Sequence, residues 1–383
     1  MATDPEIKQV AELLKRSKIS PEDLKSIDSV SVSEYQVGMK GEDGEPRVVD
    51  LVSRRVKVTP RKDETGPKWP VIRQARPLTI KPVKRRQSPA LLSGWKHAVL
   101  LPDPQIGFRK VGDDLIPMHD ERAIDVALKV LAAVQHDVGV DQVVNLGDFL
   151  DLTEQSRFQQ EPAFVQTTQP SIDYGSTFLA QQRATAPDAE MVLLEGNHDK
   201  RMQNFTIVNA AASFGIRKAN APESWPVMSL PYLLRCDEID VHYIDAYPAG
   251  EYWINNKLRA IHGHKVRSSG STANLYTKDF PGISTVFGHT HRVEMHHRTV
   301  HDRKGPIRTY AASIGCLCRV DGAVPSYGSG VGIDGKPVEY WEDWQQAVGV
   351  VTYKDDEAAD HRLQIIQIQD GKAIYNLTEI AAA

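Results

Sequence analysis

The sequence predicts an α/β protein in which short apolar strands alternate with helices. Three apolar runs have the length of strands and end in polar residues: HAVLLPD at 97–103, VDQVVNLGD at 140–148 and AEMVLLEGN at 189–197. Between the first two, residues 121–136 carry apolar side chains at helical spacing. Strand, helix and strand in succession are typical of a layered α/β domain.

Length and composition are those of a globular protein. The chain has 383 residues, of which 41% are hydrophobic and 25% charged. No stretch approaches the roughly 18 uncharged apolar residues that a membrane helix needs, so no membrane partner is expected. The N-terminus lacks a basic region followed by an apolar run, so we expect no signal peptide and a cytoplasmic location.

Cysteine is scarce and odd in number, which argues against a disulfide framework. The three cysteines are Cys236, Cys316 and Cys318. Cys316-x-Cys318 could form half of a metal site, but there is no second cysteine pair. We therefore interpret the two as small residues on a strand.

The N-terminal part has a different pattern from the rest of the chain. Residues 1–58 are predicted to form a small module with two short helices between 5 and 28 and a β-hairpin over 30–58. Ser20 followed by Pro21 is the start signal for the second helix. Prolines and basic residues then predict an extended linker over 59–94, followed by one domain over 95–383.

Positive charge is concentrated at residues 54–86. This segment has twelve Lys and Arg residues against two acidic ones, which gives it a charge of +10, while the whole chain carries −4. Such a segment could bind the phosphate backbone of nucleic acid by releasing counterions. It could equally be a solvated linker without a partner, and both interpretations stay open.

Each apolar strand is followed by side chains that can bind a metal. Further strands are predicted at 239–245, 257–262 and 283–287. Because strand ends are where loops converge in layered α/β folds, these side chains should meet in one place. Carboxylate, amide and imidazole donors together suit Mn²⁺, Fe²⁺ or Zn²⁺. The candidate ligands are Asp103, Asp148, Asn197, His262, His289 and His291.

Five ordered motifs carry a family resemblance. They are DPQ at 103–105, GDFLD at 147–151, GNHD at 196–199, HGH at 262–264 and GHTH at 288–291. In this order, each after a strand, they resemble the motifs of calcineurin-like metallophosphoesterases, and the likeness spans residues 97 to about 318. The N-terminal part is similar to extensions in phage-borne members, which would place the protein in the host cytoplasm.

The resemblance implies a fold and a metal centre. The fold would be a β-sandwich flanked by helices, in four α/β/β/α layers. Asp103 and His291 would hold a first divalent ion, and Asp148 would bridge it to a second. The second ion would also be bound by Asn197, His262 and His289. We expect Mn²⁺ first, with Fe, Zn or Mg as alternatives.

The resemblance also implies a reaction. A hydroxide that bridges the two ions would attack a phosphate ester in line. His198 would protonate the leaving oxygen as general acid, with Asp151 orienting it. Asp199 is interpreted as a turn residue. Arg201 and Arg292 adjoin ligands in the sequence and are the candidates for contacting the substrate phosphate.

Gln105 departs from the family pattern, which has Asp-x-His in the first motif. An amide oxygen is a neutral and weaker donor than imidazole, so the first metal should bind less tightly, with Mn²⁺ favoured over Zn²⁺. Alternatively, Gln105 is a structural residue beside the ligands.

Three functions are compatible with these motifs. The first is a phosphodiesterase, plausibly acting on nucleic acid as a nuclease. The second is a phosphatase or phosphodiesterase of small nucleotides or phosphomonoesters. The third is a catalytically weak binding protein on the same fold, an alternative that Gln105 keeps open.

Overall fold

The computed structural model describes most of the chain and divides it into two compact units, Met1–Leu78 and Thr79–Ala383. Most of the basic segment 54–86 and of the expected linker 59–94 lies outside the described residues. The described residues are 4–16, 24–40, 45–60, 94–157, 161–220, 222, 225–267, 270–324, 330–331, 337–338 and 342–383.

The N-terminal unit contains one helix and one long hairpin. Helix α1 (Asp4–Arg16) ends in two basic residues, which the helix dipole favours. Strands β1 (Leu24–Lys40) and β2 (Pro46–Pro60) pair antiparallel, as the sequence predicts.

The second predicted helix, over 20–28, is wrong from Leu24 onward. That stretch is the start of β1, where Leu24 pairs with Pro60 and Ile27 with Val58. The strand β2 thereby occupies the backbone groups that a helix would have bonded internally, so tertiary pairing outweighs the local start signal.

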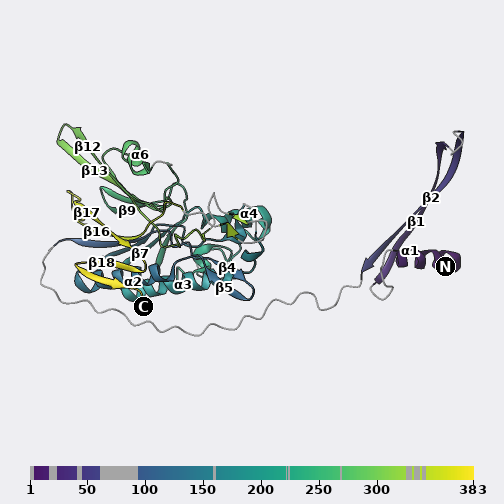
Figure 1. Ribbon diagram of the computed structural model, residues 1–383, viewed down its shortest axis with the longest axis horizontal. Coiled ribbons are helices and arrows are strands. Elements are labelled where there is room, and N and C mark those ends of the chain that lie inside the picture. The colour runs from purple at the N-terminus through teal and green to yellow at the C-terminus, as the bar shows by residue number, and fades with distance from the viewer. Residues whose placement is uncertain are drawn as a thin grey trace. The chain divides into compact units, whose positions relative to one another are not determined.

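A six-stranded sheet forms the centre of the second unit, with the strand order β17-β16-β3-β6-β7-β8. Its strands β7, β16 and β17 are labelled in Figure 1. Four neighbours, β3, β6, β7 and β8, run parallel. The strand β16 pairs antiparallel with both β3 and β17. The bounds are β3 (Lys96–Leu101), β6 (Gln142–Asn145), β7 (Glu190–Leu194), β8 (Val241–Ile244), β16 (Gln346–Tyr353) and β17 (His361–Ile368).

A five-stranded sheet has the order β12-β13-β11-β10-β9. Its inner strands β10, β11 and β13 are parallel, which requires crossover connections and directs their carboxyl ends to one edge. The bounds are β9 (Glu251–Asn255), β10 (Leu258–Ile261), β11 (Ser284–Phe287), β12 (Val293–Asp302) and β13 (Gly305–Ile314).

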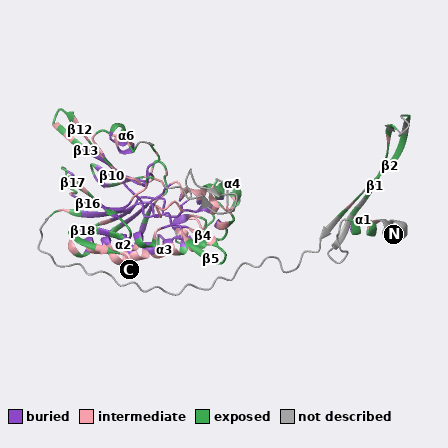
Figure 2. Cartoon of the chain, in the orientation of Figure 1, coloured by how far each residue is buried: buried purple, intermediate pink, exposed green. Residues whose placement is uncertain are grey.

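Helices cover both sheets, and the buried side chains show which faces meet. α2 (Glu121–Asp137) and α3 (Thr168–Thr185) share one core with Val99, Val143 and Leu193 of the six-stranded sheet. The opposite face of that sheet, with Leu100 and Val144, shares a second core with the five-stranded sheet. α6 (Thr272–Asp279) packs on the far face of the five-stranded sheet, through a third cluster. Figure 2 shows this buried interior.

The structure is therefore mixed α/β, and the helix predicted at 121–136 is confirmed as α2. No described helix is both long enough and apolar enough to cross a membrane. The remaining elements are β4 (Phe108–Val111), β5 (Asp114–Pro117), α4 (Lys200–Asn209), α5 (Leu230–Leu233), β14 (Gly330–Val331), β15 (Pro337–Val338), β18 (Lys372–Tyr375), β19 (Thr378–Ala381) and the short 3₁₀ turns Thr153–Gln155, Pro162–Phe164 and Ala211–Ser213.

Candidate metal centre

Loops after five parallel strands bring the predicted ligands together. They follow β3, β6 and β7 in one sheet and β10 and β11 in the other. Two groups of potential ligand atoms result, each with all its atoms within 4.8 Å of one another. Asp148 belongs to both. The groups are Asp103, Asp148 and His291, and Asp148, His262 and His289.

Contacts within this cluster orient its donors. His291 Nε2 lies 3.5 Å from Asp103 Oδ1, and His262 Nε2 lies 3.4 Å from Asp148 Oδ1. Asn197 Oδ1 is 3.2 Å from the same His262 nitrogen. The other ring nitrogen of His262, Nδ1, donates to the Leu146 carbonyl at 2.8 Å, since a carbonyl can only accept. This bond leaves Nε2 of His262 facing the cluster.

The backbone around the cluster is strained. Asp103, Asp148, His289 and His291 have φ values of 38°, 45°, 66° and 57°, in the left-handed region that side chains disfavour. Such conformations persist only where surrounding structure enforces them, and they gather at functional sites.

Two glycines allow the carboxylates to approach the backbone closely. A Cβ atom at Gly288 would lie 2.2 Å from Asp103 Oδ2, and one at Gly196 would lie 2.2 Å from Asp148 Oδ1. Any side chain at either position would push a carboxylate out of place. Only glycine therefore fits at the first position of GNHD and of GHTH, because a side chain there would collide with a carboxylate.

The pKa values of His262 and His289 are shifted in opposite directions. Burial opposes a charged His262, yet the nearby Asp148 carboxylate raises the pKa of His262 to about 9. Burial and the positive charge of His262 lower the pKa of His289 to about 3. Despite its burial, Asp148 is held ionised by His262 and His198, which keep its pKa well below the usual range. A buried anion among imidazoles is the electrostatic environment that a divalent cation would occupy.

The donor set fits divalent metal ions. Among the predicted ligands that the structure describes, three buried atoms have no hydrogen-bond partner: Asp103 Oδ2, Gln105 Oε1 and His289 Nδ1. Buried polar atoms without partners are costly, and a bound cation would satisfy them. Gln105 is 3% exposed, with its amide nitrogen 3.4 Å from His198 Nε2, so its oxygen is free for a metal.

His198 lies between the cluster and a carboxylate. Its Nδ1 is 2.6 Å from Asp151 Oδ1, and its backbone N–H donates to Asp148 Oδ1 at 2.8 Å. Its Nε2 faces Arg201, whose Nη2 is 3.3 Å away. Arg201 also donates to the Asp151 carbonyl at 2.7 Å, so it is part of the same site.

Arg292 does not join this cluster. Its guanidinium donates to the carbonyls of Arg267 at 3.0 Å and Asp343 at 3.3 Å. Arg292 adjoins His291 in the sequence, but His291 has a left-handed backbone conformation with φ of 57°, and the Arg292 guanidinium bonds to other loops. A contact between Arg292 and substrate phosphate stays a prediction that these bonds do not favour.

Several residues around the site were not predicted to support it. Asp199, interpreted as a turn residue, is 1% exposed and accepts hydrogen bonds from the backbone N–H groups of Phe149, Leu150 and Gly196. It thereby ties the loop after β6 to the loop after β7. Trp344 packs edge-on against the His291 ring, with the ring centroids 4.4 Å apart.

Known proteins resemble the chain only at low sequence identity. No protein-family model matches the sequence. The chain is 28% identical over 196 residues to the Gene 54 protein of Mycobacterium phage D29, covering 48% of this chain and 68% of that protein. It is 25% identical over 195 residues to the Gene 54 protein of Mycobacterium phage L5, with the same coverage.

The chain also has a distant structural similarity to a solved protein. The crystal structure of Chaetomium thermophilum Vps29 aligns with 71% of this chain and 93% of its own, at 11% identity and a TM-score of 0.27. A score this low does not establish a shared fold. The chain thus resembles two mycobacteriophage proteins in sequence.

Replacing Asp199 with Ala should destabilise the protein without removing any of the predicted metal ligands. Three buried N–H groups would lose their acceptor, which should lower the free energy of unfolding by about 2–4 kcal/mol. Urea denaturation in EDTA, followed by circular dichroism, measures this. Asp114→Ala, on the exposed strand β5, is the control and should stay within about 0.5 kcal/mol of the unaltered chain. Equal stabilities of the two variants would contradict the role of Asp199.

Proposed function

We propose that the chain is a divalent-metal-dependent phosphoesterase of the calcineurin-like type that hydrolyses phosphodiesters, nucleic acid included. The observation that carries the proposal is the convergence of five strand-end motifs around Asp148, which both oxygen-rich groups of potential ligands share. The packing of two sheets against each other, with helices on their outer faces, supports the four-layer arrangement that the motifs imply. The two bacteriophage relatives support a phage-encoded protein that works in the host cytoplasm.

Two ions would divide the donors between them. Asp103, His291 and the Gln105 amide oxygen would hold the first, and Asn197, His262 and His289 would hold the second, with Asp148 shared. When bound, the ions would activate the attacking water and neutralise charge on the phosphoryl oxygens. Four oxygen donors, one of them the Gln105 amide, favour Mn²⁺ over Zn²⁺.

The chain's own residues would handle the proton and the phosphate. Asp151 accepts the Nδ1 proton of His198 at 2.6 Å and so fixes the ring with Nε2 towards the centre. From Nε2, His198 would protonate the leaving oxygen. Arg201 lies beside that nitrogen, where its planar guanidinium would bind a non-bridging phosphate oxygen.

The proposed hydrolysis is tested with Mn²⁺ and four substrates: bis-p-nitrophenyl phosphate, p-nitrophenyl phosphate, and single- and double-stranded DNA. We expect cleavage of the diester and of DNA, and a loss of more than about 100-fold in Asp148→Ala, because this variant lacks the shared ligand. Asp114→Ala should retain activity. Cleavage of small monoesters alone would favour a phosphatase, and no cleavage of any substrate would favour a binding protein.

Gln105→His should tighten the first metal position. Imidazole is the stronger donor, so the Mn²⁺ concentration for half-maximal activation should fall by roughly tenfold. Gln367→His, on the exposed face of β17, is the matched control and should leave that concentration unchanged. An unchanged value for Gln105→His would mean that Gln105 is not a ligand.

Removing residues 1–90 should separate DNA binding from catalysis. The deletion takes away the segment with charge +10, so DNA affinity and its dependence on salt should both fall. Turnover of bis-p-nitrophenyl phosphate should be retained, because all proposed ligands lie in the second unit. Binding titrations across a range of salt concentrations measure the difference. Equal affinity and salt slope in both proteins would exclude the basic segment as a nucleic-acid contact.

A further inference from the structure

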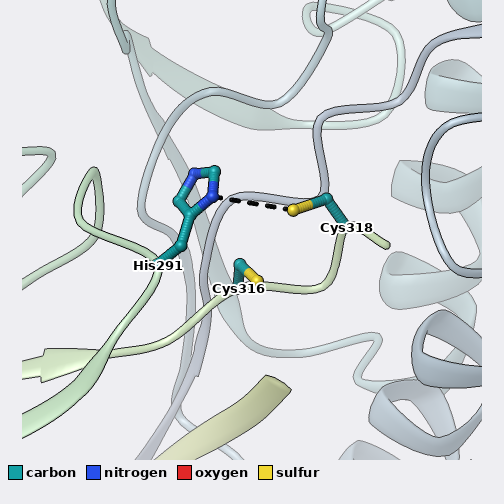
Figure 3. A group of neighbouring side chains, drawn as sticks. All are labelled: His291, Cys316 and Cys318. Atoms are coloured by element: carbon teal, nitrogen blue, oxygen red, sulfur yellow. Dashed lines mark hydrogen bonds between the residues drawn. The ribbon is translucent and has the colours of Figure 1, made fainter. Parts of the chain in front are cut away.

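The structure gives the Cys316-x-Cys318 pair a third potential ligand that the sequence did not reveal. Figure 3 shows His291 beside the two thiols. The donor atoms of these three residues all lie within 4.8 Å of one another, and Cys318 Sγ is 3.7 Å from His291 Nδ1. Both cysteines are 0% exposed and His291 is 3% exposed.

The chain holds both thiols in fixed positions. Cys316 and Cys318 follow β13. Leu317, between them, packs into the main core, which is the core that the six-stranded sheet shares with α2 and α3. The side chains of the two cysteines therefore point away from that core, on the same side of the chain. The backbone N–H of Cys316 donates to the Gln345 carbonyl at 3.0 Å. The side chain of Gln346 donates to the Cys318 carbonyl at 2.8 Å. These bonds preorganise the pair on a rigid segment.

The two nitrogens of His291 face chemically different surroundings. Nε2 faces Asp103, 3.5 Å away, in the oxygen-rich cluster. Nδ1 faces the sulfur of Cys318. The thiols themselves lie in a separate apolar cluster with Met118, Phe164 and Val324. Oxygen donors select hard cations and thiolates select soft ones, so the two sides of one imidazole offer different sites.

We propose that Cys316, Cys318 and Nδ1 of His291 form a three-donor site for a thiophilic d¹⁰ cation such as Cd²⁺, Zn²⁺ or Cu⁺. Binding of a divalent ion there forms two metal–sulfur bonds and one metal–nitrogen bond. The two thiol protons, and the Nδ1 proton where His291 carries one, are released to solvent. The site requires no hydrolytic activity. It shares the ring of His291 with the oxygen-rich cluster, and the backbone N–H of Leu317 donates to the Asp103 carbonyl at 3.1 Å.

Cadmium is the probe that distinguishes the two sides of His291. The full chain is first saturated with Mn²⁺ and then titrated with Cd²⁺ while thiolate-to-metal charge-transfer absorption is recorded in the ultraviolet. We expect a band that saturates at one equivalent and is lost in Cys316→Ser and in Cys318→Ser. Cys236→Ser is the matched control, since Cys236 is also buried but lies in the main core, away from this cluster.

Two further readouts keep the test independent of folding and of the proposed function. X-ray absorption at the cadmium edge of the unaltered chain should show sulfur neighbours, and it needs no variant. The band should persist in Asp148→Ala, which lacks the shared ligand of the oxygen-rich cluster. Loss of hydrolysis with the band intact would therefore leave this site standing. A shell of only oxygen and nitrogen, a band that survives in either Cys316→Ser or Cys318→Ser, or a band lost in Cys236→Ser would overturn the proposal.

Discussion

The buried carboxylate of Asp148 is the group on which the rest of the site depends. It is 1% exposed, and an anion taken out of water is costly unless charged or polar groups compensate it. His262 Nε2 at 3.4 Å and the backbone N–H of His198 at 2.8 Å provide that compensation. Both partners come from loops distant in the sequence, so the charge of Asp148 specifies how loops from the two sheets meet.

The loops that compensate the charge of Asp148 have strained backbones, and the two sheets hold these loops in place. Asp148 itself has a left-handed backbone, and Gly196 leaves space for its carboxylate. Asp199 then bonds the two loops together through three backbone N–H groups. Beneath them, the core that the two sheets share is closed to water. Strain of this kind persists only when a rigid scaffold enforces it, which explains why the donors follow short strands whose carboxyl ends are buried.

The sequence predicts the parts whose signal is local. The apolar run predicted as a strand at 97–103 is β3, which ends at Leu101, and the stretch with helical periodicity at 121–136 is α2. α3 (Thr168–Thr185) went unpredicted because Pro170 and Gly175 interrupt a weak apolar pattern. At 24–28 a local helix signal gives way to pairing with β2. Ligand candidates were identifiable because each directly follows an apolar strand.

What the sequence could not supply is long-range contact. Cys318 lies beside His291, and the Leu146 carbonyl orients His262 across 116 positions of the chain. No local sequence pattern predicts either of these two contacts. Arg292 shows the converse, since it adjoins the predicted ligand His291 in the sequence while its guanidinium bonds to other loops.

The central claim is that one carboxylate is shared by two metal positions, and anomalous diffraction tests it most directly. Crystals of the full chain grown with Mn²⁺ should show two anomalous peaks roughly 3.5–4 Å apart, with Asp148 between them. One peak should adjoin Asp103 and His291, and the other Asn197, His262 and His289. A single peak, or none at these residues under saturating Mn²⁺, would contradict the account.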